Sequence, residues 1–221
     1  MKYMKKITLS IILCAITVLS FAQTVKTKGG IDPKTWSAGQ TAEVSISSIP
    51  TSVDAFKSLQ QKLGTTPEGC VMLQLVAFEM YNQNKAVGEQ CIRLNNTDVN
   101  IPSVMRRMQD IFSKTDVSYA RPHLVATYFA GATPDNGFNP KKPYTIKVRS
   151  SKVHQYERSQ SLQGYVLHLE VFSTGYDTSW RGCEVVKQKG NNFYKVSNCP
   201  SMYVQCKEVD FDAKEDYKGI R

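Results

Sequence analysis

Hydrophobic residues recur at helical spacing through the first half of the chain. Over 53–63 they return every three or four positions, with Ser52 before them as an N-cap and Gly64 after them as a stop. A second start signal stands at Thr66, followed by a proline and an acid, and residues 70–81 are apolar nearly all round. The pattern predicts an amphipathic helix followed by a buried central helix.

Three more segments have helical signals. Residues 85–94 read as a short helix, and Pro102 begins another that is apolar on one side and basic on the other. Arg121-Pro122 opens a last expected helix that stops at Gly131, although residues 125–128 suit a strand as well.

The period changes after the loop 132–143, which holds three prolines and an Asn136-Gly137 turn. Alternation of apolar and polar residues predicts strands over 41–49, 144–149 and 165–172. Shorter candidate strands are 183–189, 193–197 and 203–209. We therefore predict an α+β fold, with N-terminal helices packed on one face of a C-terminal, mostly antiparallel β-sheet. Separate helical and sheet domains are the alternative.

The first residues are patterned as an export signal. Lysines precede an apolar run over 7–19, and Ser20-Phe21-Ala22 places small residues as a signal peptidase site requires. An uncleaved anchor is the alternative, but the run is shorter than the roughly 20 residues of a spanning helix. We predict a signal peptide cleaved after Ala22, no membrane span after cleavage, and a periplasmic or secreted protein.

After the predicted signal peptide, the chain is predicted to consist of an N-terminal segment, one domain and a C-terminal tail. Residues 23–50 form an N-terminal segment, loose over 23–40 with one short strand after it, and 212–221 form a polar tail. Between them we predict a single domain over 51–211, mainly helical over 51–131 and mainly stranded over 143–211.

Basic residues are concentrated in one region of the chain. The chain has a net charge of +9 from 28 Lys+Arg and 19 Asp+Glu. Six basic residues and one acid, Glu157, lie within 141–158; the six are Lys141, Lys142, Lys147, Arg149, Lys152 and Arg158. Such a patch suits an anionic partner, or it is simply a solvated strand face and loop. No nucleic-acid module is visible, so nucleic acid is not an expected partner.

Five of the six cysteines follow the predicted signal peptide. Outside the cytosol the expectation is disulfides. Cys183 and Cys199 are equidistant from Asn191 in a predicted hairpin turn, and Cys70 and Cys91 flank a helix–turn–helix. These are the expected pairs, with Cys206 left free or joined to Cys199. No spacing is that of a metal site, and no cofactor is expected.

Candidate catalytic residues are few. His168 and Glu170 share the polar face of one predicted strand, with Lys147 and Arg149 across from them on its neighbour. One interpretation is a histidine–carboxylate pair, and the other is a charged cross-strand cluster facing water. Cys206, beside a lysine, is the candidate nucleophile for a hydrolase if it is unpaired.

Aromatic residues suggest binding rather than catalysis. Tyr176, Trp180 and Tyr194 flank predicted turns, where flat amphipathic rings suit sugar or protein surfaces. With Lys147 and Arg149 they are the candidate binding residues. Burial in the sheet core is the alternative for these aromatic rings.

Several turn-rich motifs resemble a bacterial family of exported proteins that is defined only as a domain of unknown function. The matching segments are Arg121-Pro122, Gly131 to Phe138, Pro143-Tyr144-Thr145, and the course from Gly164 through Gly175, Asp177 and Arg181 to Gly190. The resemblance covers roughly 50–210 and implies an envelope or secreted location. It carries no catalytic residues to this chain.

These observations favour a non-enzymatic periplasmic or secreted binding module, whose partner is a protein or an anionic glycan. The alternative is a cell-envelope hydrolase that uses Cys206 or the His168/Glu170 pair. A toxin-neutralising partner is a third possibility, which the sequence alone does not separate from the first.

Overall fold

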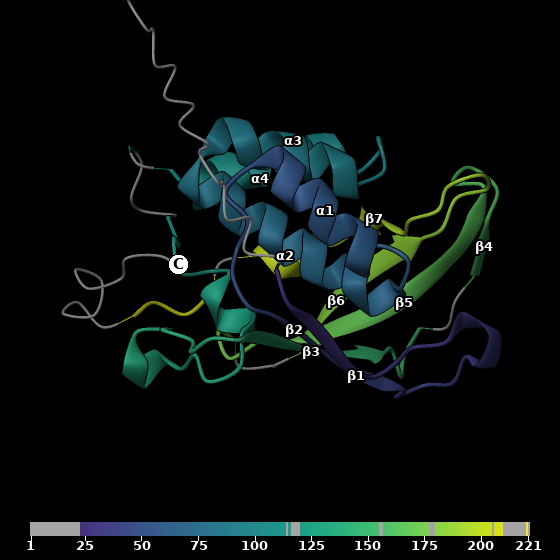
Figure 1. Cartoon of the computed structure of the whole chain (residues 1–221), viewed down its shortest axis with the longest axis horizontal. Helices are drawn as coiled ribbons and strands as arrows, with labels where there is room; N and C mark the ends of the chain where they lie inside the picture. Colours follow the sequence, from purple (N-terminus) through teal and green to yellow (C-terminus); the bar gives the residue numbers. More distant parts are fainter. Residues whose placement is uncertain are drawn as a thin grey trace, which may run out of the picture.

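A computed structural model describes residues 23–113, 115, 120–154, 157–176, 180–204, 206–209 and 220. The predicted signal peptide and all of the predicted polar tail except Ile220 lie outside these residues. The described chain has an α+β fold, as predicted, with four α-helices and a seven-stranded antiparallel sheet (Figure 1). The helices are α1 Val53–Leu63, α2 Pro67–Gln83, α3 Lys85–Asn95 and α4 Ile101–Ile111. The strands are β1 Val25–Gly29, β2 Thr41–Ile46, β3 Tyr144–Ser150, β4 Glu157–Ser159, β5 Gly164–Phe172, β6 Trp180–Val186 and β7 Lys195–Asn198.

The strand order is β1-β2-β3-β5-β6-β7, and β4 pairs with β5. The sheet is therefore not purely C-terminal, because β1 and β2 precede all four α-helices and form one side of the sheet. The expectation of a loose segment over 23–40 is wrong at β1, which pairs with β2 along Val25–Gly29. Its lysines kept the strand from being recognised, and lysine is typical of an edge strand, where it discourages further pairing.

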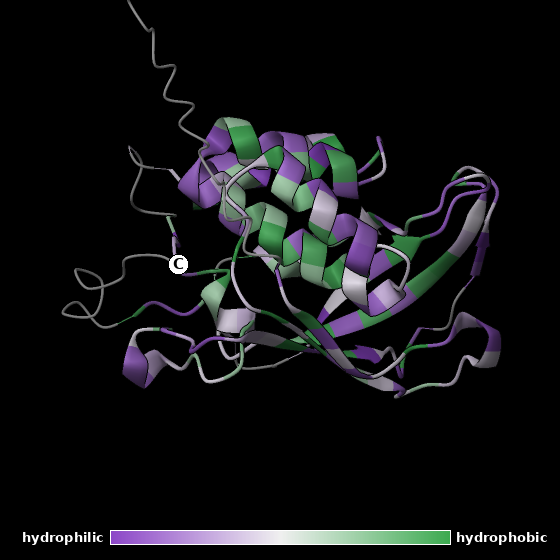
Figure 2. Ribbon diagram, viewed as in Figure 1, coloured by the Kyte–Doolittle hydropathy of each residue, from purple (hydrophilic) through white to green (hydrophobic). Residues whose placement is uncertain are grey.

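Helix α2 is the centre of the helical layer. Thr66 caps it by accepting from the Gly69 amide, and every residue from Pro67 to Tyr81 is buried. It contacts β2, β3, β5, β6 and β7 on one side and α1, α3 and α4 on the other. Figure 2 shows hydrophobic residues concentrated along α2 and the sheet beneath it. Because α2 has neighbours all round, its sequence has no polar stripe.

The alternation in each strand separates an inner face from an outer face. In β3 the side chains of Tyr144, Ile146 and Val148 are buried, whereas Lys147 between them is exposed. The inner face packs against α2, and we call the opposite side the outer face of the sheet (Figure 1). Polar side chains of β2, β3, β5 and β6 meet there because successive strand residues point to opposite sides.

Buried amides connect the helices to the far edge of the sheet. The Gln74 side chain on α2 accepts hydrogen bonds from Asn95 and Asn96, both at 2.9 Å. Asn96 also forms a parallel bridge with Val196 of β7, and Asn100 donates to the Asn96 side chain at 2.8 Å. All four amide side chains are buried, so this network holds α2, α3 and β7 in one arrangement.

Two predicted elements are wrong. The helix expected over 121–131 is a turn followed by the short 3₁₀ helix Ala126–Tyr128. Every residue over 123–129 is buried, and the Thr127 hydroxyl bonds Ser173 at 2.8 Å, so the apparent helical spacing reflects general burial. The strand expected over 203–209 is also absent from the residues described there. A 3₁₀ helix, Pro200–Tyr203, includes the first residue of this segment, and Pro200 at its start cannot donate to a sheet ladder.

All five cysteines after Ala22 are free thiols, so neither predicted disulfide is present. Cys183 and Cys199 follow the register that pairs Glu184 with Asn198, but β7 ends at Asn198. The Cys199 sulfur instead accepts from the buried amides of Gln74 and Asn100, at 3.7 and 3.9 Å.

The Cys70–Cys91 pairing fails for a different reason. Helices α2 and α3 reverse at Asn84, which lies 14 residues after Cys70 but only seven before Cys91. The two thiols are therefore offset by about 10 Å along the helix pair, at 1.5 Å per residue. The Cys70 thiol donates instead to Asn95 at 3.8 Å.

Candidate functional site

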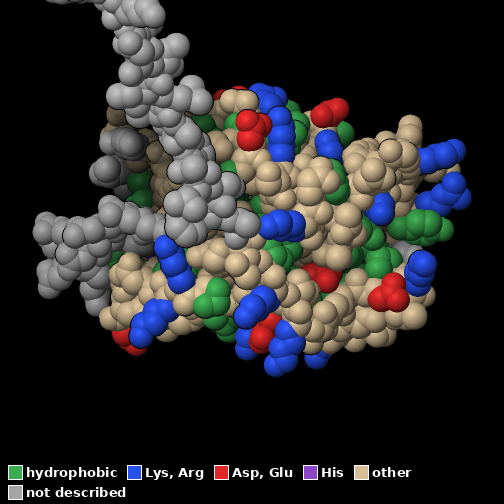
Figure 3. All heavy atoms as spheres, in the orientation of Figure 1, with side chains coloured by type: hydrophobic (Ala, Val, Ile, Leu, Met, Phe, Trp, Pro, Cys, Tyr) green, Lys and Arg blue, Asp and Glu red, His purple; other side chains and the backbone are tan. Residues whose placement is uncertain are grey.

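The outer face of the sheet carries rows of side chains set by the strand register. Lys28 of β1 lies opposite Glu43 of β2, which lies opposite Lys147 of β3. In the next row, Arg149 lies opposite Glu170 of β5. Figure 3 shows basic side chains gathered over the β1 end of the sheet with acidic ones among them. The face is therefore charged in a mixed pattern.

Trp180 provides an aromatic surface inside this charged face. The Arg149 guanidinium carbon lies 4.0 Å from the centre of the Trp180 ring, and Phe172 contacts that ring edge-on with centroids 5.4 Å apart. Arg149 also donates to Glu170 at 2.6 Å. The arginine is thus held by stacking and by an ion pair, which fixes the plane of its donors.

A cleft of about 400 Å³ opens beside Trp180. Its lining residues are Lys28, Gly29, Thr41, Ala42, Glu43, Lys147, Val148 and Trp180. Lys147 lies 3.6 Å from Glu43, and both side chains are largely exposed, so this ion pair is weak. The cleft therefore offers two ammonium groups and an aromatic wall to a ligand, and one carboxylate competes for them.

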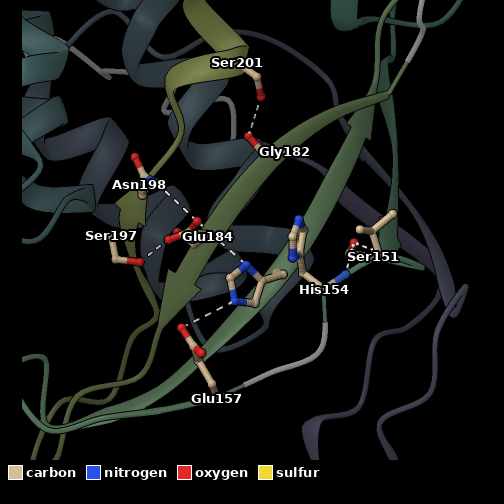
Figure 4. Close-up of polar contacts among 10 residues, drawn as sticks. Ser151, His154, Glu157, Gly182, Glu184, Ser197, Asn198 and Ser201 are labelled. Carbon is tan, nitrogen blue, oxygen red and sulfur yellow. Dashed lines mark hydrogen bonds and ion pairs between the residues drawn. The ribbon is translucent and has the colours of Figure 1, made fainter.

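A second polar cluster surrounds His168 on the same face, and Figure 4 labels its members Glu157, Glu184 and His154. Its Nδ1 lies 3.7 Å from a Glu184 oxygen and its Nε2 lies 3.9 Å from a Glu157 oxygen. Asn198 donates to Glu184 at 3.2 Å, and the His154 ring lies 5.4 Å from the His168 ring, centre to centre. A cavity of about 200 Å³ adjoins this cluster.

The proposed catalytic pair of His168 and Glu170 is not formed. Glu170 bonds Arg149, and the carboxylates nearest His168 belong to Glu157 and Glu184. Both imidazole–carboxylate distances exceed hydrogen-bond length, so neither carboxylate fixes the imidazole tautomer as a catalytic triad requires. The geometry matches the alternative interpretation, a charged cross-strand cluster.

Cys206 lies away from this face, in the segment 206–209. Its sulfur is 3.5 Å from His123 Nε2, but that nitrogen is also 2.9 Å from the Lys207 carbonyl oxygen. A carbonyl only accepts, so Nε2 donates to it and is not a base toward the thiol. Burial raises the pKa of Cys206 to about 12, which keeps the thiol protonated at neutral pH.

The candidate binding residues divide into two groups. Lys147, Arg149 and Trp180 lie together on the outer face, whereas Tyr176 and Tyr194 are each only 8% exposed. Tyr176 donates to the Val204 carbonyl at 2.9 Å and stacks under Arg181, 3.7 Å from ring centre to guanidinium carbon. The predicted exposure of both tyrosines is thus corrected, because each packs against the core.

Sequence reasoning missed five contributors to the outer face: Lys28, Glu43, Glu157, Phe172 and Glu184. The alternation of β5 and β6 would have placed Phe172 and Glu184 on the polar side. Lys28 could not be placed from the sequence, because β1 was not recognised as a strand.

Within the described part of the chain, no group of three His, Cys, Asp or Glu side chains is arranged to hold a metal ion. None of the described helices is long and apolar enough to cross a membrane.

These features define an α+β domain with an open sheet face that carries charged and aromatic side chains. The model of one family, described as "Domain of unknown function (DUF6935)", matches residues 48–210. The chain belongs to this family. Comparison with curated proteins and comparison with solved structures each gave no match.

Proposed function

We propose that this chain is an exported, non-enzymatic binding module that holds an anionic glycan on the outer face of its sheet. The observation that carries the proposal is the juxtaposition of Trp180 with Arg149, beside a cleft that Lys28 and Lys147 line. An aromatic ring next to fixed cations is suited to an acidic sugar, since the ring packs on the sugar face and the cations meet its charges.

Export is part of the proposal and is supported by the basic and apolar leader that ends at Ala22. An exported domain meets the acidic polysaccharides of cell envelopes and extracellular matrices. The basic excess over 141–158 includes Lys147, which lines the cleft, and Arg149, which stacks on Trp180 at the cleft wall.

The hydrolase alternative is weaker on chemical grounds. A thiol nucleophile acts as the thiolate, and burial moves Cys206 strongly toward the thiol. Glu170 is committed to Arg149, and the His168 nitrogens lie beyond hydrogen-bond distance from their carboxylates. Binding requires none of these groups to react.

The test is titration calorimetry of residues 23–221 with an oligogalacturonate as the acidic glycan and a neutral dextran fragment as the control. We expect the acidic oligomer alone to bind, more weakly as salt rises. Trp180→Ala should weaken binding by about tenfold or more, the loss of about 1.4 kcal/mol or more. Lys147→Ala should weaken it less, and Lys34→Ala, outside the cleft, should leave it unchanged.

Equal affinity for both oligomers, or an unchanged affinity in Trp180→Ala, would contradict this assignment. Circular dichroism of each variant separates lost binding from lost folding. Turnover of any oligomer that depends on His168 or Cys206 would favour the hydrolase instead.

A further inference from the structure

A second cleft lies in the helical layer, on the other side of the sheet from the outer face. It is formed where α2 ends, α3 begins and α4 ends, and its volume is about 520 Å³. The lining residues are Tyr81, Asn82, Gln83, Lys85, Gln109, Phe112, Ser113 and Thr115. We call it the Tyr81 cleft. None of the lining residues that the structure describes is an acid.

The hydroxyl of Tyr81 has no hydrogen-bond partner in the part of the chain that the structure describes. Tyr81 is only 4% exposed, and its oxygen is buried without a hydrogen bond among the described residues. Its backbone cannot shift easily, because α3 touches it at Gly88, where an added Cβ would lie 2.1 Å from the Tyr81 backbone. Buried hydroxyls are normally bonded, so an unmade bond beside a cleft points to a ligand.

The neighbouring amides are held in place with their oxygens available. The Asn82 amide nitrogen donates to the Pro122 carbonyl at 2.9 Å, and that of Gln83 donates to Glu79 at 3.1 Å and to the Ile220 carbonyl at 2.7 Å. Since these bonds use the nitrogens, the groups that the two amides offer to a ligand are acceptors.

The cleft also has an aromatic wall and a cation. The rings of Tyr81 and Phe112 are 6.3 Å apart and tilted by 38°. Lys85 is the first residue of α3, so its ammonium adds to the positive end of that helix. A suitable ligand has one flat apolar side, hydroxyls that both donate and accept, and a negative charge.

We propose that the Tyr81 cleft binds one sugar-acid ring, such as a uronic acid residue. The ring packs on Tyr81 and Phe112, its carboxylate accepts from Lys85 and from the Tyr81 hydroxyl, and its other hydroxyls donate to the oxygens of Asn82 and Gln83. This site is independent of the outer face and shares no residue with it.

The experiment is an NMR titration of residues 23–221 with glucuronate, with glucose as the neutral control and acetate as the ring-free control. We expect glucuronate alone to shift the amide signals around Tyr81 and Lys85, with a Kd of about 1 mM. Lys85→Gln should abolish the preference for glucuronate over glucose, and Lys34→Gln should not.

Tyr81→Phe separates a ligand role from a structural role. We expect about tenfold weaker glucuronate binding, with Tm unchanged or higher, because the variant removes a hydroxyl that no group of the described residues satisfies. A clear fall in Tm would show that the hydroxyl has a structural partner and would overturn the proposal. Absence of glucuronate binding, or unaltered binding in Tyr81→Phe, would also overturn it.

The outer-face site and the Tyr81 cleft can be tested independently, so one proposal can be wrong while the other holds. Trp180→Ala leaves the Tyr81 cleft intact, so it should not affect the shifts around Lys85. If Trp180→Ala removes glucuronate binding while Tyr81→Phe does not, the outer face is the only sugar site and the Tyr81 cleft is not one.

Discussion

Arg149 bonds Glu170 at 2.6 Å while its guanidinium carbon lies 4.0 Å from the centre of the Trp180 ring. The arginine joins β3 to β5 and reaches the first residue of β6. One side chain thus couples the stability of the sheet to the surface that we propose binds an acidic glycan. Breaking the Arg149–Glu170 ion pair should therefore change stability and glycan affinity in opposite directions.

Glu170→Gln should lower stability and raise affinity. Both partners are about one-fifth exposed, so we expect a loss of about 1–2 kcal/mol in the free energy of unfolding, between the values for exposed and buried ion pairs. The freed Arg149 should bind oligogalacturonate more tightly. Denaturant unfolding and calorimetry measure the two effects. Glu43→Gln, at the exposed Lys147 pair, is the stability control and should change it little.

Glu79 should make stability depend on pH. It is fully buried on α2, and burial raises its pKa to about 7 despite hydrogen bonds from Gln83 and Asn82. Because the folded pKa exceeds the unfolded one, the folded state binds more protons, and stability falls as pH rises from about 4.5 to about 7.

Glu79→Gln should remove this slope. The difference in unfolding free energy between wild type and variant should change by up to about 3 kcal/mol across that interval. Urea unfolding at several pH values measures it. A parallel dependence in both proteins would mean that Glu79 does not titrate in this range.

The cysteine thiols should be unreactive toward thiol reagents in the folded protein. All five cysteines after Ala22 are buried, and burial raises the pKa of Cys91, Cys199 and Cys206 to about 12. Reaction with a thiol reagent should be negligible at neutral pH until denaturant is added, when five groups react. A count of three in unreduced protein would indicate one disulfide, for which Cys183 and Cys199 are best placed by register.

Gly88→Ala should destabilise the helical layer severely. A Cβ there would lie 2.1 Å from the Tyr81 backbone, so α2 and α3 must separate, at a cost of about 2–3 kcal/mol or more. Alanine favours helices over glycine by about 1 kcal/mol, so propensity alone predicts the reverse. Gly182→Ala is the control, since its nearest neighbour would be the Ser201 hydroxyl at 3.6 Å. Thermal unfolding compares the two.

Local signals in the sequence were sufficient for much of the helical layer. Ser52 and Thr66 cap helices at the predicted positions, because a cap depends on residues only three positions away. Alternation also placed Lys147 and Arg149 on one side of β3. These features are decided within a few residues, so one sequence contains the information.

Contacts between distant segments were not accessible in this way. Trp180 meets Arg149 only because β5 lies between β3 and β6, an order that strand patterns do not specify. Tyr176 and Tyr194 were expected at the surface, but contacts with separate segments bury them. Likewise, the Tyr81 hydroxyl, which has no partner among the described residues, becomes buried only once α3 and α4 are packed beside α2.

The position of β2 has a consequence for the timing of folding. Its partner on one side, β3, begins about 100 residues later in the chain, so the two strands join only after all four α-helices have been made. Such distant pairing slows folding because a large loop must close first. A chain that folds slowly stays unfolded for longer and can pass through a narrow channel during that time. Because we propose that this protein is exported across a membrane, slow pairing of β2 with β3 is an advantage.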